Sequence, residues 1–144
     1  VEYVGIERYP VSLEEAFQLE YPKMLKWSGS EAMYRKMHEV SWENTHQLTP
    51  NFGLKKCQKD FFEVNQSSLF NLVYFDAFGA RVQPELWTAA LFEKMFRALK
   101  PNGILVTYSA KGSVRRALQE VGFVVERLPG PPGKREMLRA TKKE

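Results

Sequence analysis

The chain has 144 residues, 44% of them apolar and 13% aromatic, which suits one globular domain and excludes a disordered chain. No apolar stretch approaches the roughly 20 residues that a membrane-spanning helix needs. The single cysteine, Cys57, excludes an internal disulfide and a zinc site built from several cysteines, and it fits a reduced, cytoplasmic setting. The net charge of +4 selects no partner by itself.

The first elements can be predicted from residue patterns. The stretch VEYVGIE alternates and then turns apolar, which predicts a strand ending at Glu7. In SLEE, Ser12 and Glu15 have the spacing of a capping box, so a helix should begin at Leu13. Pro22 lies where a second helical turn could begin, and a further helix is expected from Ser30.

The next segment contains the only two histidines. His38 falls in the helix that begins at Ser30, and His46 falls in the connection after it. We interpret both as structural residues, so no metal site is predicted. The stretch TPNFG (49–53) should interrupt the helical pattern before it. A strand is expected from there to about Lys59, with Asp60 directly after it.

The second half alternates between strands and helices. NLVYFDAF (71–78) is a continuous apolar run, typical of a strand covered on both faces. PELWTAALFEKMFRALK (84–100) has apolar residues at helical spacing. ILVTYS (104–109) predicts a buried strand and GSVRRALQEVG (112–122) a helix. This alternation indicates an α/β fold with a parallel, helix-covered sheet.

The chain is expected to close with an antiparallel hairpin. FVVERL (123–128) and REMLRAT (135–141) predict two strands, separated by the Pro- and Gly-rich stretch PGPPGK. The final pair therefore adds an antiparallel edge to the mostly parallel sheet.

Three acidic residues follow predicted strands, namely Glu7, Asp60 and Asp76. Ligands of open α/β sheets bind beyond the carboxyl ends of the strands. Glu7 would suit ribose hydroxyls and Asp60 an adenine amino group. Each acid could instead cap a helix or face solvent, and the sequence leaves this open.

Asp76 and Phe78 indicate different chemistry. A carboxylate can hydrogen-bond an amine and hold its lone pair in line with an electrophile, and an aromatic ring tolerates a nearby cation. A sulfonium methyl donor is such a cation. Methyl transfer depends mainly on positioning. We therefore interpret Asp76 as the residue that orients a reacting amine.

The end of the chain is basic. From Lys111 onward there are nine Lys and Arg residues against four acids. Such a basic region favours binding of a polyanionic partner, because binding releases counterions. The candidate contacts are Lys111, Arg115, Arg116, Lys134 and Arg135. A solvated surface, or pairing with Glu120 or Glu136, is the alternative.

Three stretches, VYFDAFGARVQPELWT, LKPNGILVTYSAKGSVRRALQEVGF and GKREML, together resemble the methyltransferase domain of MnmC-type tRNA modification enzymes. The resemblance implies a Rossmann-like class I methyltransferase sheet with S-adenosylmethionine as cofactor. It also implies methylation of an aminomethyl group on the wobble uridine of tRNA, giving 5-methylaminomethyl-2-thiouridine.

The resemblance assigns roles to residues and partners as well. It implies that Asp76 is the catalytic carboxylate with Phe78 beside it, and that Glu7, Asp60 and Asp76 contact the cofactor. The basic residues would meet the tRNA anticodon loop. A fused or separate oxidase would supply the aminomethyl group. A small-molecule amine as substrate, or a non-catalytic RNA-binding module, are the alternatives.

One feature departs from that family. Its sheet begins with a strand and a glycine-rich loop, yet none of the nine glycines here forms a G-x-G motif. We therefore expect this chain to be the C-terminal portion of a longer domain, without the first strand and its loop. The strands around Val4–Glu7 and Leu72–Asp76 should then not pair, and a slot about one strand wide, roughly 9–10 Å, should separate them.

Overall fold

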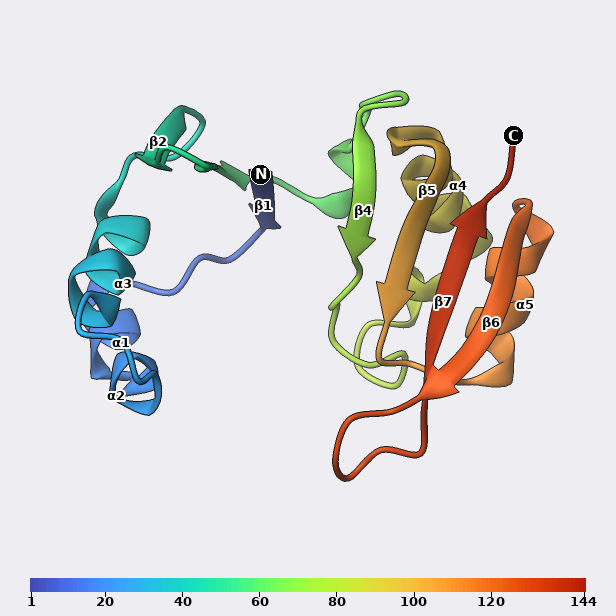
Figure 1. The fold of residues 1–144 in the computed structure, drawn as a ribbon. Helices are drawn as coiled ribbons and strands as arrows, with labels where there is room; N and C mark the ends of the chain where they lie inside the picture. The colour runs from blue at the N-terminus through green and yellow to red at the C-terminus, as the bar shows by residue number, and fades with distance from the viewer. The chain divides into compact units, whose positions relative to one another are not determined.

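The computed structural model describes residues 1–144, which form two compact units, Val1–Phe61 and Phe62–Glu144 (Figure 1). The expected single domain stays a prediction. The first unit contains β1 (Glu2–Glu7), α1 (Leu13–Gln18), α2 (Tyr21–Met24), α3 (Ser30–Glu39), β2 (Thr45–Thr49) and β3 (Phe52–Gln58).

The sheet of the first unit has the strand order β1-β3-β2. Strand β1 runs parallel to β3, from Glu2 opposite Gly53 to Glu7 opposite Gln58. The residues after Glu7 and after Gln58 therefore leave the sheet at the same edge. Strand β2 is antiparallel to β3 and was not predicted. Only Leu48 of β2 is buried, so this polar edge strand has no apolar pattern to reveal it.

The helices of the first unit begin where the sequence predicts. The Glu15 amide donates to Ser12 Oγ at 3.2 Å and the Ser12 amide to Glu15 Oε2 at 3.0 Å, which confirms the capping box of α1. Helix α1 is linked to α3 by the Tyr34 hydroxyl, which donates to the Ala16 carbonyl at 2.7 Å.

The second unit has the sheet order β4-β5-β7-β6. Strand β4 is parallel to β5, whereas β7 is antiparallel to both β5 and β6, which confirms the predicted closing hairpin. Its elements, after the 3₁₀ turn η1 (Phe61–Glu63), are β4 (Phe70–Tyr74), η2 (Pro84–Trp87), α4 (Ala89–Ala98), β5 (Leu99–Thr107), α5 (Gly112–Glu120), β6 (Phe123–Pro129) and β7 (Glu136–Lys142).

The core of this unit lies between the sheet and the helices α4 and α5, which cover one of its faces (Figure 1). Phe92 of α4, Leu105 of β5, Leu118 of α5 and Leu138 of β7 are fully buried. Burying side chains of this size contributes about 1.5–3 kcal/mol each. None of the helices in the chain is both long and apolar enough to span a bilayer.

The expected single helix over residues 84–100 is wrong in detail. Thr88 adopts an extended conformation, with φ −102° and ψ 156°, and separates the 3₁₀ turn η2 from α4. Its hydroxyl donates to the Glu85 carbonyl at 3.1 Å. A short polar side chain that bonds to nearby backbone competes with helix continuation at this point.

The expectation that β4 is covered on both faces is also wrong. Leu72 is 43% and Tyr74 68% exposed, while Phe75, directly after the strand, is buried. Strand geometry sends alternate side chains to opposite faces, so an apolar run need not mean two covered faces. Strand β1 pairs with β3 in the first unit, and β4 pairs with β5 in the second. The predicted spacing between β1 and β4 stays a prediction.

Candidate functional site

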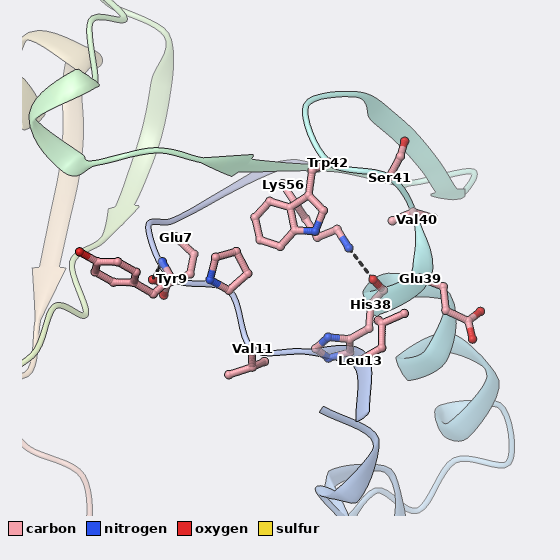
Figure 2. Close-up of a pocket in the computed structure, with 11 residues that line it drawn as sticks. Glu7, Tyr9, Val11, Leu13, His38, Glu39, Val40, Ser41, Trp42 and Lys56 are labelled. Atoms are coloured by element: carbon pink, nitrogen blue, oxygen red, sulfur yellow. Dashed lines mark hydrogen bonds between the residues drawn. The ribbon is translucent and has the colours of Figure 1, made fainter. Parts of the chain in front are cut away.

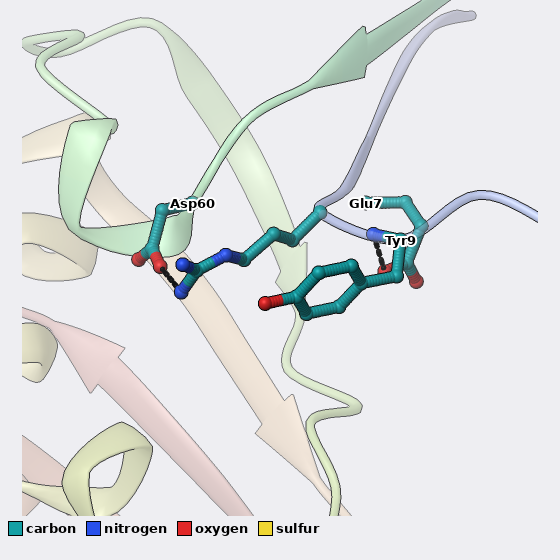
Figure 3. A network of polar contacts seen from close by, with 4 residues as sticks. Glu7, Tyr9 and Asp60 are labelled. Atoms are coloured by element: carbon teal, nitrogen blue, oxygen red, sulfur yellow. Dashed lines mark hydrogen bonds and ion pairs between the residues drawn. The ribbon is translucent and has the colours of Figure 1, made fainter.

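Glu7 is the last residue of β1 and lies at the carboxyl edge of the first unit's sheet. Its Oε1 accepts a hydrogen bond from the Tyr9 amide at 2.9 Å (Figure 3). The chain thus turns back on the carboxylate just after the strand. This contact fixes one carboxylate oxygen, and the side chain remains exposed to a ligand.

Asp60 lies two residues after β3 and forms an ion pair with Arg8, with 2.6 Å between Oδ2 and Nη1 (Figure 3). Because β1 and β3 are parallel neighbours, the structure brings Glu7 and Asp60 to one edge, as the sequence predicts. The sequence analysis missed Arg8. The signal was available, since Arg8 is a cation directly after Glu7 in the sequence.

A pocket opens beside Glu7 between the β1–α1 connection and the end of α3 (Figure 2). Lys56 on its wall donates to the His38 carbonyl at 2.7 Å, and its ammonium lies 5.1 Å from the centre of the Trp42 ring. Burial lowers the pKa of Lys56, and burial together with the Lys56 charge lowers the pKa of His38.

The two histidines are engaged within the first unit. The His38 ring lies 4.5 Å from the Tyr34 ring, and His46 Nε2 lies 2.9 Å from Ser41 Oγ. These contacts agree with the structural role predicted for both.

Asp76 and Phe78 follow β4 in the second unit and both point outward. Asp76 is exposed and Phe78 is 72% exposed. Phe75, directly before Asp76, and Ala77, between Asp76 and Phe78, are buried. Residues 75–78, which we call the D-x-F loop, therefore alternate between buried and exposed side chains. The carboxylate and the ring are both exposed, two residues apart.

Two aromatic residues that the sequence analysis missed donate hydrogen bonds to backbone carbonyls of the D-x-F loop. The Tyr108 hydroxyl donates to the Ala77 carbonyl at 2.7 Å, and Trp87 Nε1 donates to the Phe78 carbonyl at 2.7 Å. Both aromatic residues lie within the stretches that carry the family resemblance, which was the available signal. Burial and the Asp76 charge raise the pKa of Tyr108, so its hydroxyl remains a donor at neutral pH.

The five basic candidates lie at the predicted places in the second unit. Lys111 is the N-cap residue of α5, and Arg115 and Arg116 lie in its first turns. Lys134 and Arg135 lie in the β6–β7 connection. None of the five is ion-paired. Of the two acids considered as alternative partners, Glu136 pairs with Arg127 at 3.8 Å and Glu120 forms no ion pair.

The five are not equally available to a ligand. The Lys134 ammonium lies 4.0 Å from the centre of the Tyr108 ring, which is a cation–π contact. Arg115 Nε is buried without a hydrogen-bond partner. Lys111, Arg116 and Arg135 are exposed and make no such contact. The structure thus favours these three as surface cations.

Solved structures share the fold. The crystal structure of MNMC2 from Aquifex aeolicus matches with a TM-score of 0.70 and 24% identity, over 96% of this chain and 43% of that one. A SAM-dependent O-methyltransferase from Thermotoga maritima matches with a TM-score of 0.51 and 18% identity, over 98% of this chain and 49% of that one. These likenesses confirm the predicted Rossmann-like methyltransferase sheet.

Curated relatives and a family profile agree with that fold. The tRNA 5-methylaminomethyl-2-thiouridine biosynthesis bifunctional proteins MnmC of Pseudomonas aeruginosa and Pseudomonas paraeruginosa are 31% and 30% identical over 98% of this chain. The chain spans 22% of the length of each of these relatives. The profile of the S-adenosyl-L-methionine-dependent methyltransferase family matches residues 17–143. The chain therefore belongs to the S-adenosyl-L-methionine-dependent methyltransferase family.

Proposed function

We propose that the protein methylates an aminomethyl group on the wobble uridine of tRNA. Membership of the S-adenosyl-L-methionine-dependent methyltransferase family supports methyl transfer from that cofactor. The observation that carries the choice of an amine is the D-x-F loop, which exposes the Asp76 carboxylate and the Phe78 ring two residues apart. The names of the Pseudomonas relatives support tRNA as the substrate class.

Asp76 acts by orienting the nucleophile. A carboxylate that accepts a hydrogen bond from an amine N–H directs the nitrogen lone pair away from itself. The amine must be neutral to react, and it releases a proton once it carries the methyl group. Positioning of this kind can provide a large share of the rate enhancement, since well-oriented reactants have high effective molarities. The exposed Phe78 ring tolerates positive charge.

Glu7 and Asp60 are assigned to cofactor binding. S-adenosyl-L-methionine, when bound, supplies the methyl group. The carboxylate of Glu7 at the end of β1 suits ribose hydroxyls, a common role at this position of nucleotide-binding sheets. Asp60 suits the adenine amino group, and Arg8 holds its Oδ2. Both carboxylates accept hydrogen bonds, which fits the hydroxyl and amino donors of the nucleoside part of the cofactor.

The exposed cations Lys111, Arg116 and Arg135 are assigned to tRNA phosphates. Arginine binds phosphate through paired N–H groups, and lysine binds as a point charge. Lys134 and Arg115 are assigned smaller contributions to tRNA binding. The Lys134 ammonium covers the Tyr108 ring, and the Arg115 guanidinium is partly buried. A tRNA substrate would place the protein in the cytoplasm, with an oxidase, fused or separate, providing the aminomethyl group.

The test is transfer of labelled methyl groups by the full-length protein to three acceptors. These are tRNA carrying the aminomethyl group, the same tRNA without it, and a free small-molecule aminomethyl compound. We expect labelling of the first alone. Labelling of the small amine at an equal rate would replace the proposal with a small-molecule methyltransferase. Binding of tRNA without any transfer would indicate a non-catalytic RNA-binding module.

A further inference from the structure

Three of the four residues of the D-x-F loop, Phe75, Ala77 and Phe78, are tied to the rest of the second unit. The Phe75 amide donates to the Val106 carbonyl at 2.9 Å, and its ring packs edge-on against Trp87, with 5.2 Å between centroids. Ala77 is buried and its carbonyl accepts from Tyr108. Asp76 is therefore flanked on both sides by anchored residues.

Phe78 is fixed by two successive peptide planes. The Ala77 carbonyl belongs to the peptide group that precedes Phe78, and the Phe78 carbonyl, bonded to Trp87, belongs to the one that follows. Because peptide groups are planar, holding both groups restricts φ and ψ of Phe78 and so the direction of its side chain.

The two donors also support one another. The Tyr108 and Trp87 rings meet edge-on at 5.9 Å between centroids, and Trp87 packs in the same way against Phe92 of the core. Aromatic pairs in this geometry are favourable beyond the area that they bury. Lys134 from the β6–β7 connection covers the Tyr108 ring at 4.0 Å. The donors are thus held by the core on one side and by a cation on the other.

We propose that Tyr108 and Trp87 are positioning residues. They hold the backbone of the D-x-F loop so that the side chains of Asp76 and Phe78 keep the orientation that methyl transfer needs. The catalytic effect of this clamp rests on the proposed function. The hydrogen bonds of the Tyr108 hydroxyl and of the Trp87 indole N–H go to backbone carbonyls of the loop, so both residues act on the position of its backbone. Small displacements of a positioning group are costly, with about 100-fold losses for shifts near 1 Å.

The test uses Tyr108→Phe in the full-length protein, which removes one hydroxyl and keeps the ring. We expect kcat for methyl transfer to fall about tenfold, with the KM for S-adenosyl-L-methionine within about twofold, since the clamp acts on orientation and not on cofactor binding. Hydrogen exchange should quicken about fivefold at the amide of Phe75, which begins the loop, and at the amides of Val82 and Gln83, which donate to the Gly79 carbonyl directly after it. Trp87→Phe should change both readouts in the same direction.

Tyr34→Phe is the matched control, because it removes a tyrosine hydroxyl that donates to a backbone carbonyl at the same 2.7 Å, in the first unit. It should leave kcat and the exchange of the loop amides unchanged.

Exchange at wild-type rates in Tyr108→Phe would overturn the clamp, and so would faster exchange with unchanged kcat. The exchange measurement needs no tRNA. If the wild type methylates no tRNA, the proposed function fails, and the exchange result still decides whether the clamp exists.

Discussion

Arg8 and Asp60 are 52 positions apart in the chain and form an ion pair with 2.6 Å between Nη1 and Oδ2. Arg8 follows the last residue of β1, and Asp60 lies two residues after β3. The pair therefore ties together the two segments that leave the carboxyl edge of the first unit's sheet. It also holds one of the two carboxylates assigned to the cofactor.

Arg8→Ala should weaken cofactor binding by only about threefold, because it loosens Asp60 without removing it, whereas Asp60→Ala should weaken it by tenfold or more, about 1.4 kcal/mol. The unfolding free energy should fall by less than about 1 kcal/mol in Arg8→Ala, as is usual for solvent-exposed pairs. Calorimetric titration with S-adenosyl-L-methionine and denaturant unfolding provide the two measurements. A larger effect of Arg8→Ala than of Asp60→Ala on binding would reject the adenine role of Asp60.

Glu7→Ala should weaken cofactor binding while the maximal rate at saturating cofactor changes little. Its proposed partners are ribose hydroxyls, which keep the same contacts in the ground state and the transition state, so the loss should appear as uniform binding. The affinity should fall about tenfold, which corresponds to the loss of strong hydrogen bonds to a charged acceptor. Glu120→Gln, on the exposed end of α5, serves as control. Equal affinities of wild type and Glu7→Ala would remove the ribose assignment.

Asp76→Ala should have the opposite profile. Its carboxylate is proposed to orient the amine, an interaction needed mainly in the transition state, so methyl transfer should fall about 100-fold or more. Cofactor affinity should change much less. Single-turnover rates with bound cofactor and aminomethyl-tRNA measure the chemical step directly. Turnover near the wild-type rate would exclude Asp76 from the mechanism.

Arg116→Ala and Arg135→Ala should each weaken tRNA binding and reduce its salt dependence by about one phosphate contact. Both guanidinium groups are exposed and lack an ion pair, so each can release counterions on binding. The control is Arg97→Ala on α4, because Arg97 is paired with Glu93 at 2.6 Å. Titrations at several salt concentrations supply the slopes. Slopes identical to those of wild type in both variants would show that these arginines do not contact RNA.

His38 should make stability depend on pH below about 6.5. Burial, aided by the charge of Lys56, lowers its pKa in the folded protein from 6.5. The unfolded chain then binds more protons than the folded one as the pH falls below 6.5, so stability is lost as the pH falls towards the lowered pKa. His38→Gln should flatten this part of the stability curve. Denaturant midpoints between pH 5 and 8 would reveal it, and equal curves for wild type and His38→Gln would contradict the shift.

Sequence patterns predicted much of this architecture. The capping box at Ser12 and Glu15, the apolar strands and the closing hairpin all depend on contacts between residues near in the chain, or on patterns that repeat with the period of one element. The placement of Glu7 and Asp60 at one edge also followed, because parallel strands share the direction of their ends.

Other features depended on partners distant in the chain. The polar strand β2 forms because β3 offers it hydrogen bonds, and the exposure of Leu72 and Tyr74 depends on which face of β4 the helices cover. Tyr108 lies 31 residues from Ala77, and Arg8 lies 52 residues from Asp60. Sequence patterns show which residues are apolar, charged or able to cap, but only the tertiary structure decides which distant donor meets which carbonyl or carboxylate.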